Sequence, residues 1–205
     1  SDFIFRSNGV MRQTSSTGRA IRKPNITEGN MKYIEHGSGG KPECMHIAEG
    51  PSPTPGPGEI LIEVAFAGVN RPDVLQRSGR YPPPTDASLI LGLEVSGHVA
   101  ALGAGVTEWK VGDNVTALTP GGGYAEYCIT HAAHALPIPA GMDLATAACL
   151  PENWFTVWAN LTLHGHLAAG ERILIHGGSS GIGLTAIQLA HHIGAECIVT
   201  VGSDE

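Results

Sequence analysis

The chain has 205 residues, of which 42% are hydrophobic and 15% are charged, a balance typical of a globular protein with one or two domains. Its formal net charge of −7 argues against nucleic acid as a main partner, because proteins that grip the phosphate backbone carry an excess of basic residues. No apolar run approaches the roughly 20 residues that a membrane-spanning helix needs, so no membrane segment is expected.

Residues 1–30 differ in composition from the remainder. They hold five basic and two acidic residues, are rich in Ser, Thr and Asn, and show only a short apolar stretch, Phe3-Ile4-Phe5. We expect a flexible extension or tag here. The alternative is an organelle-targeting presequence, whose composition this segment partly matches. A cytoplasmic protein is therefore expected, or a mitochondrial one if the segment is a presequence.

From Met31 to about residue 140 the chain alternates between short apolar runs and turns. Its predicted elements are strands at 31–35, 44–48, 59–69, 95–102, 114–118 and 124–129. A short helix is predicted from Pro72 to Arg77, because proline is well tolerated in the first turn of a helix. The pattern indicates an irregular β-rich domain over 31–150.

Residues 171–202 read as strand, turn, helix and strand. The apolar run Ile173-Leu174-Ile175 is typical of a strand buried on both faces, and a second run follows at 197–201. Between them Ile182, Ala186, Leu189 and Ile193 recur at helical spacing, and Gly194 follows as a helix stop. We assign 151–205 to a hinge helix and the beginning of a cofactor-binding domain.

The glycine-rich turn before this helix predicts a dinucleotide site. Glycine permits a tight turn and lets a pyrophosphate approach the backbone, while the first amides of the helix favour phosphate. The turn contains no lysine, so a Walker-type triphosphate site is excluded. The predicted cofactor-binding residues are Gly178, Ser179, Ser180, Gly181, Ile182 and Gly183.

The four cysteines, Cys44, Cys128, Cys149 and Cys197, are far apart and form no CxxC pair. This usage indicates a reducing compartment and no structural metal.

Several segments together resemble the zinc-free quinone oxidoreductases of the medium-chain dehydrogenase/reductase superfamily, in the p53-inducible-gene-3-like and zeta-crystallin-like branch. They are Gly68-Val69-Asn70-Arg71-Pro72-Asp73, Arg77-Ser78-Gly79-Arg80-Tyr81-Pro82, Leu91-Gly92-Leu93-Glu94-Val95, Trp109-Lys110-Val111-Gly112-Asp113, Pro120-Gly121-Gly122-Gly123-Tyr124 and Leu150-Pro151-Glu152-Asn153-Trp154-Phe155-Thr156. The resemblance runs from about Met31 to Glu205.

The resemblance implies a GroES-like irregular β-barrel domain followed by the first part of a Rossmann doubly wound domain, with the active site between them. Only the first two of the family's six Rossmann strands precede Glu205, so a fragment of a longer enzyme is expected. The full-length enzyme is expected to be a homodimer.

Zinc is not expected. The zinc-dependent relatives carry Cys where this chain has Asn70 and His where it has Leu93, and leucine cannot bind a metal. Glu94 alone does not make a site. His131 and His134 have tolerable spacing for metal ligands, but they are interpreted as surface histidines.

Without a Lewis acid, the substrate must accept hydride readily, as quinones and enones do. By resemblance, Tyr81 and Asn70 orient or polarise the substrate carbonyl, Asp73 arranges them, and Asn70 and Thr156 contact the cofactor. The alternatives are that Asn70 and Asp73 merely cap the following helix, and that Thr156 is an ordinary helix residue. An enoyl-thioester reductase and a non-catalytic dinucleotide-binding relative remain alternative functions.

The end of the second predicted strand bears on the choice between NADP and NAD. An NAD site usually places Asp or Glu there, whereas this chain has Thr200-Val201-Gly202-Ser203. Ser203 is predicted to donate to a 2′-phosphate, although Asp204 argues mildly the other way. NADP is favoured over NAD.

Overall fold

A computed structural model of the chain describes residues 2–5, 10–14, 29–85 and 87–202. The chain divides into two compact units, Ser1–Pro151 and Glu152–Glu205, which are treated separately below. Among the described residues, no helix combines the length and the apolar character that crossing a membrane requires.

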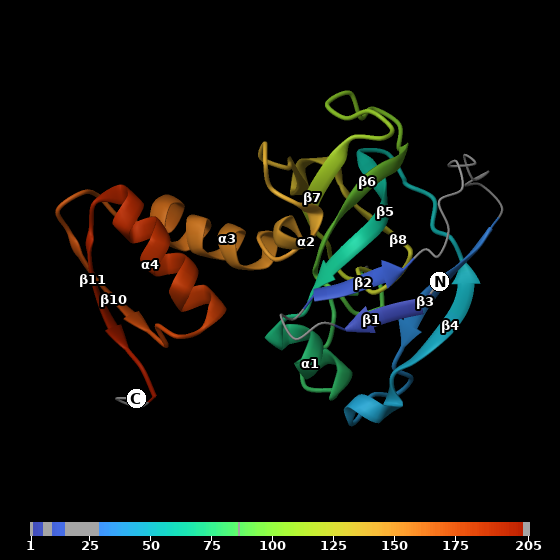
Figure 1. The fold of residues 1–205 in the computed structure, drawn as a ribbon, viewed down its shortest axis with the longest axis horizontal. Helices are drawn as coiled ribbons and strands as arrows, with labels where there is room; N and C mark the ends of the chain where they lie inside the picture. Colours follow the sequence, from blue (N-terminus) through green and yellow to red (C-terminus); the bar gives the residue numbers. More distant parts are fainter. Residues whose placement is uncertain (1, 6–9, 15–28, 86, 203–205) are drawn as a thin grey trace. The chain divides into compact units, whose positions relative to one another are not determined.

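The first unit is built on a seven-stranded antiparallel sheet with β5 at its centre (Figure 1). One edge of β5 pairs with β6, while the other edge pairs with β8 along its first half and with β2 at its end. The strands are β1 (Asp2–Phe5), β2 (Val10–Thr14), β5 (Glu59–Gly68), β6 (Glu94–Leu102), β7 (Asn114–Leu118), β8 (Tyr127–His131) and β9 (Ala135–Pro137).

Strand β5 lies at the centre because its residues are almost continuously apolar. Ile60, Leu61 and Ile62 are each fully buried, so both faces of the strand are covered. Val95 and Val115, on β6 and β7, join Ile60 and Ile62 in the same core cluster. The short helices of this unit are α1 (Arg71–Arg77) and α2 (Leu144–Ala147), with a 3-10 turn at Ala132–His134.

A second, two-stranded sheet in this unit is the antiparallel hairpin of β3 (Asn30–Glu35) and β4 (His46–Pro51). The sequence predicted this pair, but it placed the second strand at 44–48. The strand begins later because Pro42–Cys44 forms a 3-10 turn, and it continues to Pro51. The bridge between Tyr33 and Ala125 joins the hairpin to the larger part of the unit.

The strands β1 and β2 differ from the expectation of a flexible extension over residues 1–30. They pair with each other, and Val10 to Arg12 pair with Gly68 to Phe66 of β5. The sequence pattern missed this because β2 pairs with β1 and β5 through its backbone, which side-chain periodicity does not reveal. The other residues of 1–28 lie outside the described part of the chain.

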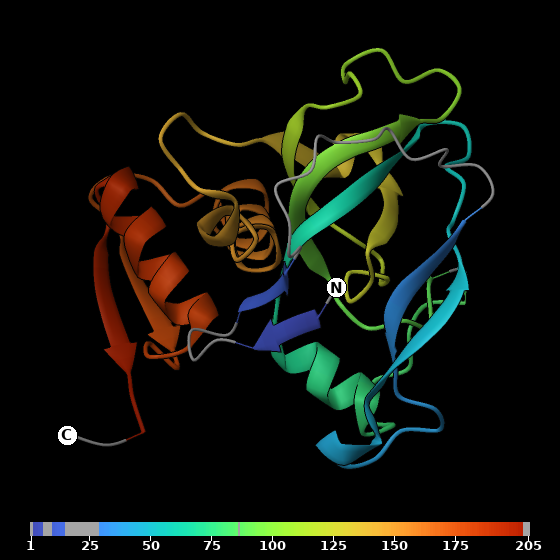
Figure 2. The same cartoon turned by 45° about the vertical axis from the view of Figure 1, so that its right-hand side comes forward.

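The second unit contains α3 (Pro151–Trp158, whose first residue belongs to the first unit), a π-helical turn (Ala159–His164), β10 (Arg172–His176), α4 (Gly181–Ile193) and β11 (Glu196–Thr200). The strands β10 and β11 are parallel, as a strand–helix–strand crossover requires, and α4 runs alongside them (Figure 2). Helix α4 ends at Gly194, whose φ of 89° is the left-handed cap predicted from the sequence.

The prediction that the first of these strands is buried on both faces is wrong for the described unit. Ile173, Ile175 and Cys197 face a core formed with Val157 of α3 and Leu189 of α4. The opposite face of the two strands is open, where Leu174 is 56% and Ile198 is 50% exposed. No described residue of this unit packs over them as α4 does over the other face.

Candidate functional site

Asn70 stands at the point where β5 ends and α1 begins. It adopts an extended conformation, with φ −120° and ψ 161°, and helical geometry starts at Arg71 with Pro72 in the first turn. The backbone N–H of Asn70 donates to Oδ2 of Asp73 at 2.8 Å. The capping role considered for Asp73 is therefore present in the structure, because this bond satisfies an amide at the start of the helix.

Asp73 is itself a buried carboxylate, only 3% exposed. Besides the Asn70 amide, it accepts the backbone N–H of Gly92 at 3.1 Å and the hydroxyl of Tyr124 at 3.0 Å. Burial raises the pKa of Asp73, and these three hydrogen bonds oppose the shift. Burial, followed by the neighbouring charge of Asp73, likewise raises the pKa of Tyr124. Asp73 thus ties α1 to the Gly92 and Tyr124 segments rather than facing solvent.

The side chain of Asn70 is bound by a second buried carboxylate. Its Nδ2 donates to Oε1 of Glu94 at 2.8 Å, and Glu94 is 2% exposed. Sequence reasoning set Glu94 aside as unable to bind a metal alone. The signal that was available is an acidic residue inside the apolar run from Leu91 to Val95, since a buried charge needs a partner. The same reasoning overlooked Tyr124.

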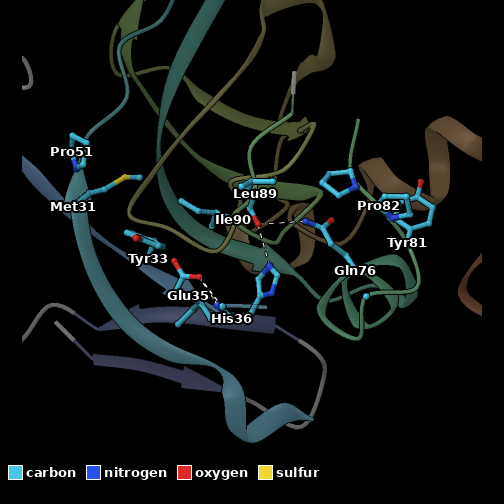
Figure 3. Close-up of a pocket in the computed structure, with 15 residues that line it drawn as sticks. Met31, Tyr33, Glu35, His36, Pro51, Gln76, Tyr81, Pro82, Leu89 and Ile90 are labelled. Carbon is cyan, nitrogen blue, oxygen red and sulfur yellow. Dashed lines mark hydrogen bonds between the residues drawn. The ribbon is translucent and has the colours of Figure 1, made fainter. Parts of the chain in front are cut away.

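Tyr81 lies on the rim of a cavity of about 580 Å³ between the β3–β4 hairpin and the loop 79–90 (Figure 3). Its side chain is 45% exposed. Within the cavity, Nε2 of His36 and Nε2 of Gln76 converge on the carbonyl oxygen of Leu89, at 3.2 and 3.5 Å. The remainder of the lining is largely apolar, with Met31, Tyr33, Ile34, Pro51, Pro82, Pro83 and Ile90.

The structure joins two of the three predicted catalytic residues directly. Asn70 and Asp73 are hydrogen-bonded. Asp73 lines a separate small cavity of about 140 Å³, and Tyr81 lines only the larger one. The shared role of the three residues in catalysis stays a prediction.

The predicted cofactor loop folds as a tight turn into α4. Gly177 has a φ of 73°, and Ser180 is the N-cap residue of the helix. Oγ of Ser180 accepts the Gly183 amide at 3.0 Å and donates to the carbonyl oxygen of Gly177 at 2.8 Å. Ser179, Gly181 and Ile182 are exposed, so solvent reaches the backbone at the N-terminus of α4.

The other three glycines of this loop, Gly178, Gly181 and Gly183, have different roles. A Cβ on Gly178 would lie 2.8 Å from Cβ of Val199, so the packing of the turn against β11 requires this glycine. A Cβ on Gly183 would lie 2.8 Å from Cα of Gly178, so the turn itself requires that one. A Cβ on Gly181 would meet only the side-chain amide of Asn153, at 3.1 Å. Asn153 therefore lies against the N-terminus of α4 and is a candidate cofactor contact that sequence reasoning did not identify.

Thr156 and Ser203 add less to the site. Thr156 is exposed, and its Oγ1 donates to the carbonyl oxygen of Glu152 one turn earlier at 2.9 Å, as an ordinary helix residue does. Its contact with a nicotinamide stays a prediction. Ser203 lies outside the described residues.

Comparison with known protein families identifies the domain type of the first unit. Residues 56–140 match the alcohol dehydrogenase GroES-like domain. The chain belongs to the medium-chain dehydrogenase/reductase superfamily. The fold agrees with this assignment, because an antiparallel GroES-like β domain precedes the start of an α/β unit.

Three relatives illustrate the breadth of this superfamily. The chain is 38% identical over 151 residues to a phthioceranic/hydroxyphthioceranic acid synthase of Mycobacterium tuberculosis, covering 74% of this chain and 7% of that protein. It is similar to a quinone oxidoreductase of Pseudomonas syringae, with 34% identity and a TM-score of 0.75 over 85% of this chain and 54% of that one. The CurK enoyl reductase gives 29% identity and a TM-score of 0.76, over 84% and 54%.

The chain thus spans only a small part of the curated relatives it matches and little more than half of these structural neighbours. Within the GroES-like domain of this superfamily member lie Asn70, Asp73, Tyr81 and Glu94, whereas the glycine turn follows it in sequence.

The donor atoms around Asn70 do not suit a catalytic zinc ion. The Asn70 amide nitrogen donates to Glu94 and offers no lone pair, and neighbouring Leu93 has no ligand atom. Over residues 29–85 and 87–202, no group of three or more His, Cys, Asp and Glu side chains is arranged to hold a metal ion. All four cysteines are free, and burial raises the pKa of Cys128 to about 12.

Proposed function

We propose that the protein carrying this chain is an NADPH-dependent reductase of quinones or enones that works without zinc. The observation that carries the proposal is the placement of Asn70, whose backbone N–H donates to buried Asp73 and whose side-chain amide donates to buried Glu94. Where zinc-dependent relatives use a metal ligand, this chain presents a hydrogen-bond donor.

The second unit supplies a fitting place for a dinucleotide. The turn at Gly177–Ser180 and the amides of the first turn of α4 suit a pyrophosphate, because the backbone is exposed there and the helix dipole favours an anion. Gly181 keeps the approach open beside Asn153. The bound nicotinamide would supply a hydride, and all other steps fall to the protein side chains.

The chain's own residues would bind and polarise the substrate. An amide nitrogen has two hydrogens, and only one of those on Asn70 is donated to Glu94. Half-buried Asn70 can therefore donate the other to a substrate oxygen, where negative charge grows as hydride adds to a quinone or an enone. The hydroxyl of Tyr81 would give a second hydrogen bond, and Asp73 would keep Asn70 in place.

NADPH is preferred in this proposal because β11 ends in Thr200, and the described residues that follow it, Val201 and Gly202, include no acidic side chain to bind ribose hydroxyls. Asp204, outside the described residues, argues mildly for NAD. Oxidation of NADPH and of NADH, each measured with a simple ortho-quinone and the complete polypeptide, tests the proposal. Quinone-dependent oxidation, faster with NADPH, is the expected result. No oxidation of either nicotinamide by quinones and enones would overturn it.

A second function is reduction of an enoyl thioester, which the similarity to the CurK enoyl reductase favours. A short-chain enoyl thioester replaces the quinone in the same assay, and the ratio of the two kcat/KM values separates the functions. Turnover of neither class, with NADPH still bound, would favour a non-catalytic dinucleotide-binding protein. By its resemblance to dimeric quinone oxidoreductases, we also propose that the full-length enzyme is a homodimer.

A further inference from the structure

Glu94 is a buried carboxylate for which the sequence offered no role. It opens β6, pairs with Leu118 of β7 across the sheet, and is 2% exposed. Its Oε1 accepts the Nδ2–H of Asn70 at 2.8 Å, although the two residues are 24 positions apart. Burying a charged group is unfavourable unless its partners compensate, so this placement needs a reason.

The sheet provides space for this carboxylate. A Cβ at Gly68, near the end of β5, would collide with Oε1 of Glu94 and lie 2.6 Å from its Cδ. Gly68 has an ordinary strand conformation, so a glycine is not needed here for the backbone geometry of a turn. It is needed because a side chain at this position would occupy the space of the Glu94 carboxylate. The carboxylate also acts on Cys149, whose pKa burial raises first and the charge of Glu94 raises further.

We propose that Glu94 is a positioning residue that sets the direction of the Asn70 amide; the proposal rests on the proposed function in assigning Asn70 to the substrate. A carboxylate can only accept hydrogen bonds, whereas the two ends of an amide differ, one donating and one accepting. Turning the Asn70 amide over would bring its Oδ1 against the Glu94 oxygen, which repels it. Glu94 therefore selects one of two amide orientations.

The backbone of the same residue is fixed independently. Oδ2 of Asp73 accepts the Asn70 N–H, so one buried carboxylate fixes the main chain and another fixes the side chain. An amide held in this way needs no reorganisation when charge develops on a substrate oxygen. Glu94 contributes to the reaction through Asn70 without touching the substrate.

The variant Glu94→Gln tests the proposal, because glutamine has nearly the same shape but pairs with an amide in either orientation. In the complete enzyme we expect kcat to fall roughly tenfold while the Kd for NADPH is unchanged, as expected when one oriented hydrogen bond is no longer fixed. In an Asn70→Ala background the same substitution should change kcat less than about twofold. Glu63→Gln, on an exposed position of β5, is the matched control and should retain wild-type kcat.

A second measurement does not depend on activity. In a ¹⁵N-labelled protein the Asn70 side-chain amide, identified by its loss in Asn70→Ala, should show one downfield, slowly exchanging proton. Glu94→Gln should shift that signal and speed its exchange. An ordinary solvent-exposed amide signal in the wild type would overturn the proposal, and this result needs no variant of Glu94 to fold.

The outcomes separate the two proposals. A protected Asn70 amide in a protein that reduces neither quinones nor enones removes the proposed function and leaves the positioning role. An active enzyme whose Glu94→Gln loss persists in the Asn70→Ala background shows that Glu94 acts on its own, and the positioning role is then wrong.

Discussion

At the scale of single residues, Tyr81 gives a test of the substrate site. It precedes Pro82 and Pro83 on the cavity rim, which restricts the backbone that carries its ring. We expect Tyr81→Phe in the complete enzyme to lower kcat/KM roughly ten- to a hundredfold, since one oriented hydrogen bond to a developing charge is worth about 1.5–3 kcal/mol. Steady-state kinetics at saturating NADPH measure the effect.

The control is Tyr33→Phe, which removes a hydroxyl from the same cavity and should leave kcat/KM unchanged. If Tyr81→Phe retains the wild-type value as well, Tyr81 is an aromatic wall against which the substrate stacks.

Asp73 predicts a pH dependence of stability. Burial raises its folded-state pKa above the unfolded value of about 3.9, so its contribution to stability is complete below that pH and is lost as the pH rises through the folded-state pKa. Asp73→Asn should remove this slope. It should also lower the free energy of unfolding by about 1–3 kcal/mol. The Asn70 and Gly92 amides donate to different oxygens of Asp73, and asparagine has only one acceptor oxygen, so one of the two amides would face an N–H group.

Urea denaturation of both proteins at several pH values, from below 3.9 upwards, measures the slope. If the free energy of unfolding changes with pH in the same way for Asp73→Asn and for the wild type, Asp73 titrates as it does in the unfolded chain, and the prediction is wrong.

At the scale of elements, the packing of the turn before α4 shows which glycine should be substituted to test NADPH binding without disturbing the fold. Valine at Gly183 would collide with the turn itself, whereas valine at Gly181 would displace only the Asn153 side chain. Gly181→Val should therefore weaken NADPH binding at least tenfold while the fold remains intact, because the new side chain occupies the pyrophosphate approach. Fluorescence titration with NADPH measures the Kd.

Gln188→Ala, on the exposed side of the same helix, is the control for α4 and should bind NADPH normally. Unchanged affinity in Gly181→Val would mean that the dinucleotide does not use this loop.

Pattern and turn chemistry predicted most of the individual elements. The helix with Pro72 in its first turn, the cap at Gly194 and the strand–turn–helix–strand order all follow from local sequence. Local pattern fails where contacts are distant or use only the backbone. Strand β2 pairs through its main chain, and Tyr124 reaches Asp73 across 51 residues. Ile182 follows the apolar helical spacing yet is 42% exposed, since it lies in the first turn of α4, beyond the core.

At the scale of the whole molecule, the chemistry of the site predicts independence from metal ions. Chelators should leave the activity of the complete enzyme unchanged, and elemental analysis of untagged protein should find far less than one zinc per chain. The reason is that Asn70 and Leu93 replace metal ligands and that Asn70 is already bonded to Glu94. Stoichiometric zinc, or loss of activity restored by added zinc, would contradict the proposed mechanism.

Sequence motifs located the candidate residues of both units but not the bonds among them. Asn70 and Glu94 were both visible in the sequence, yet their meeting depends on the pairing of β5 with β6, which brings the end of one strand beside the start of the other. A resemblance to a family assigns a role to each position separately. The hydrogen bond between Asn70 and Glu94 depends instead on the register in which β5 and β6 pair.

The close packing of Gly68 against Glu94 has a consequence for suppressor genetics. Under selection for folded protein, Gly68→Ala should be rescued by a shorter side chain at position 94, which vacates the space that the new methyl group needs. The same revertants should fail under selection for turnover, because the shortened residue no longer reaches the Asn70 amide. Two selections on one library would thus separate the residues that this domain needs to fold from the residues that it needs to orient the Asn70 amide for turnover.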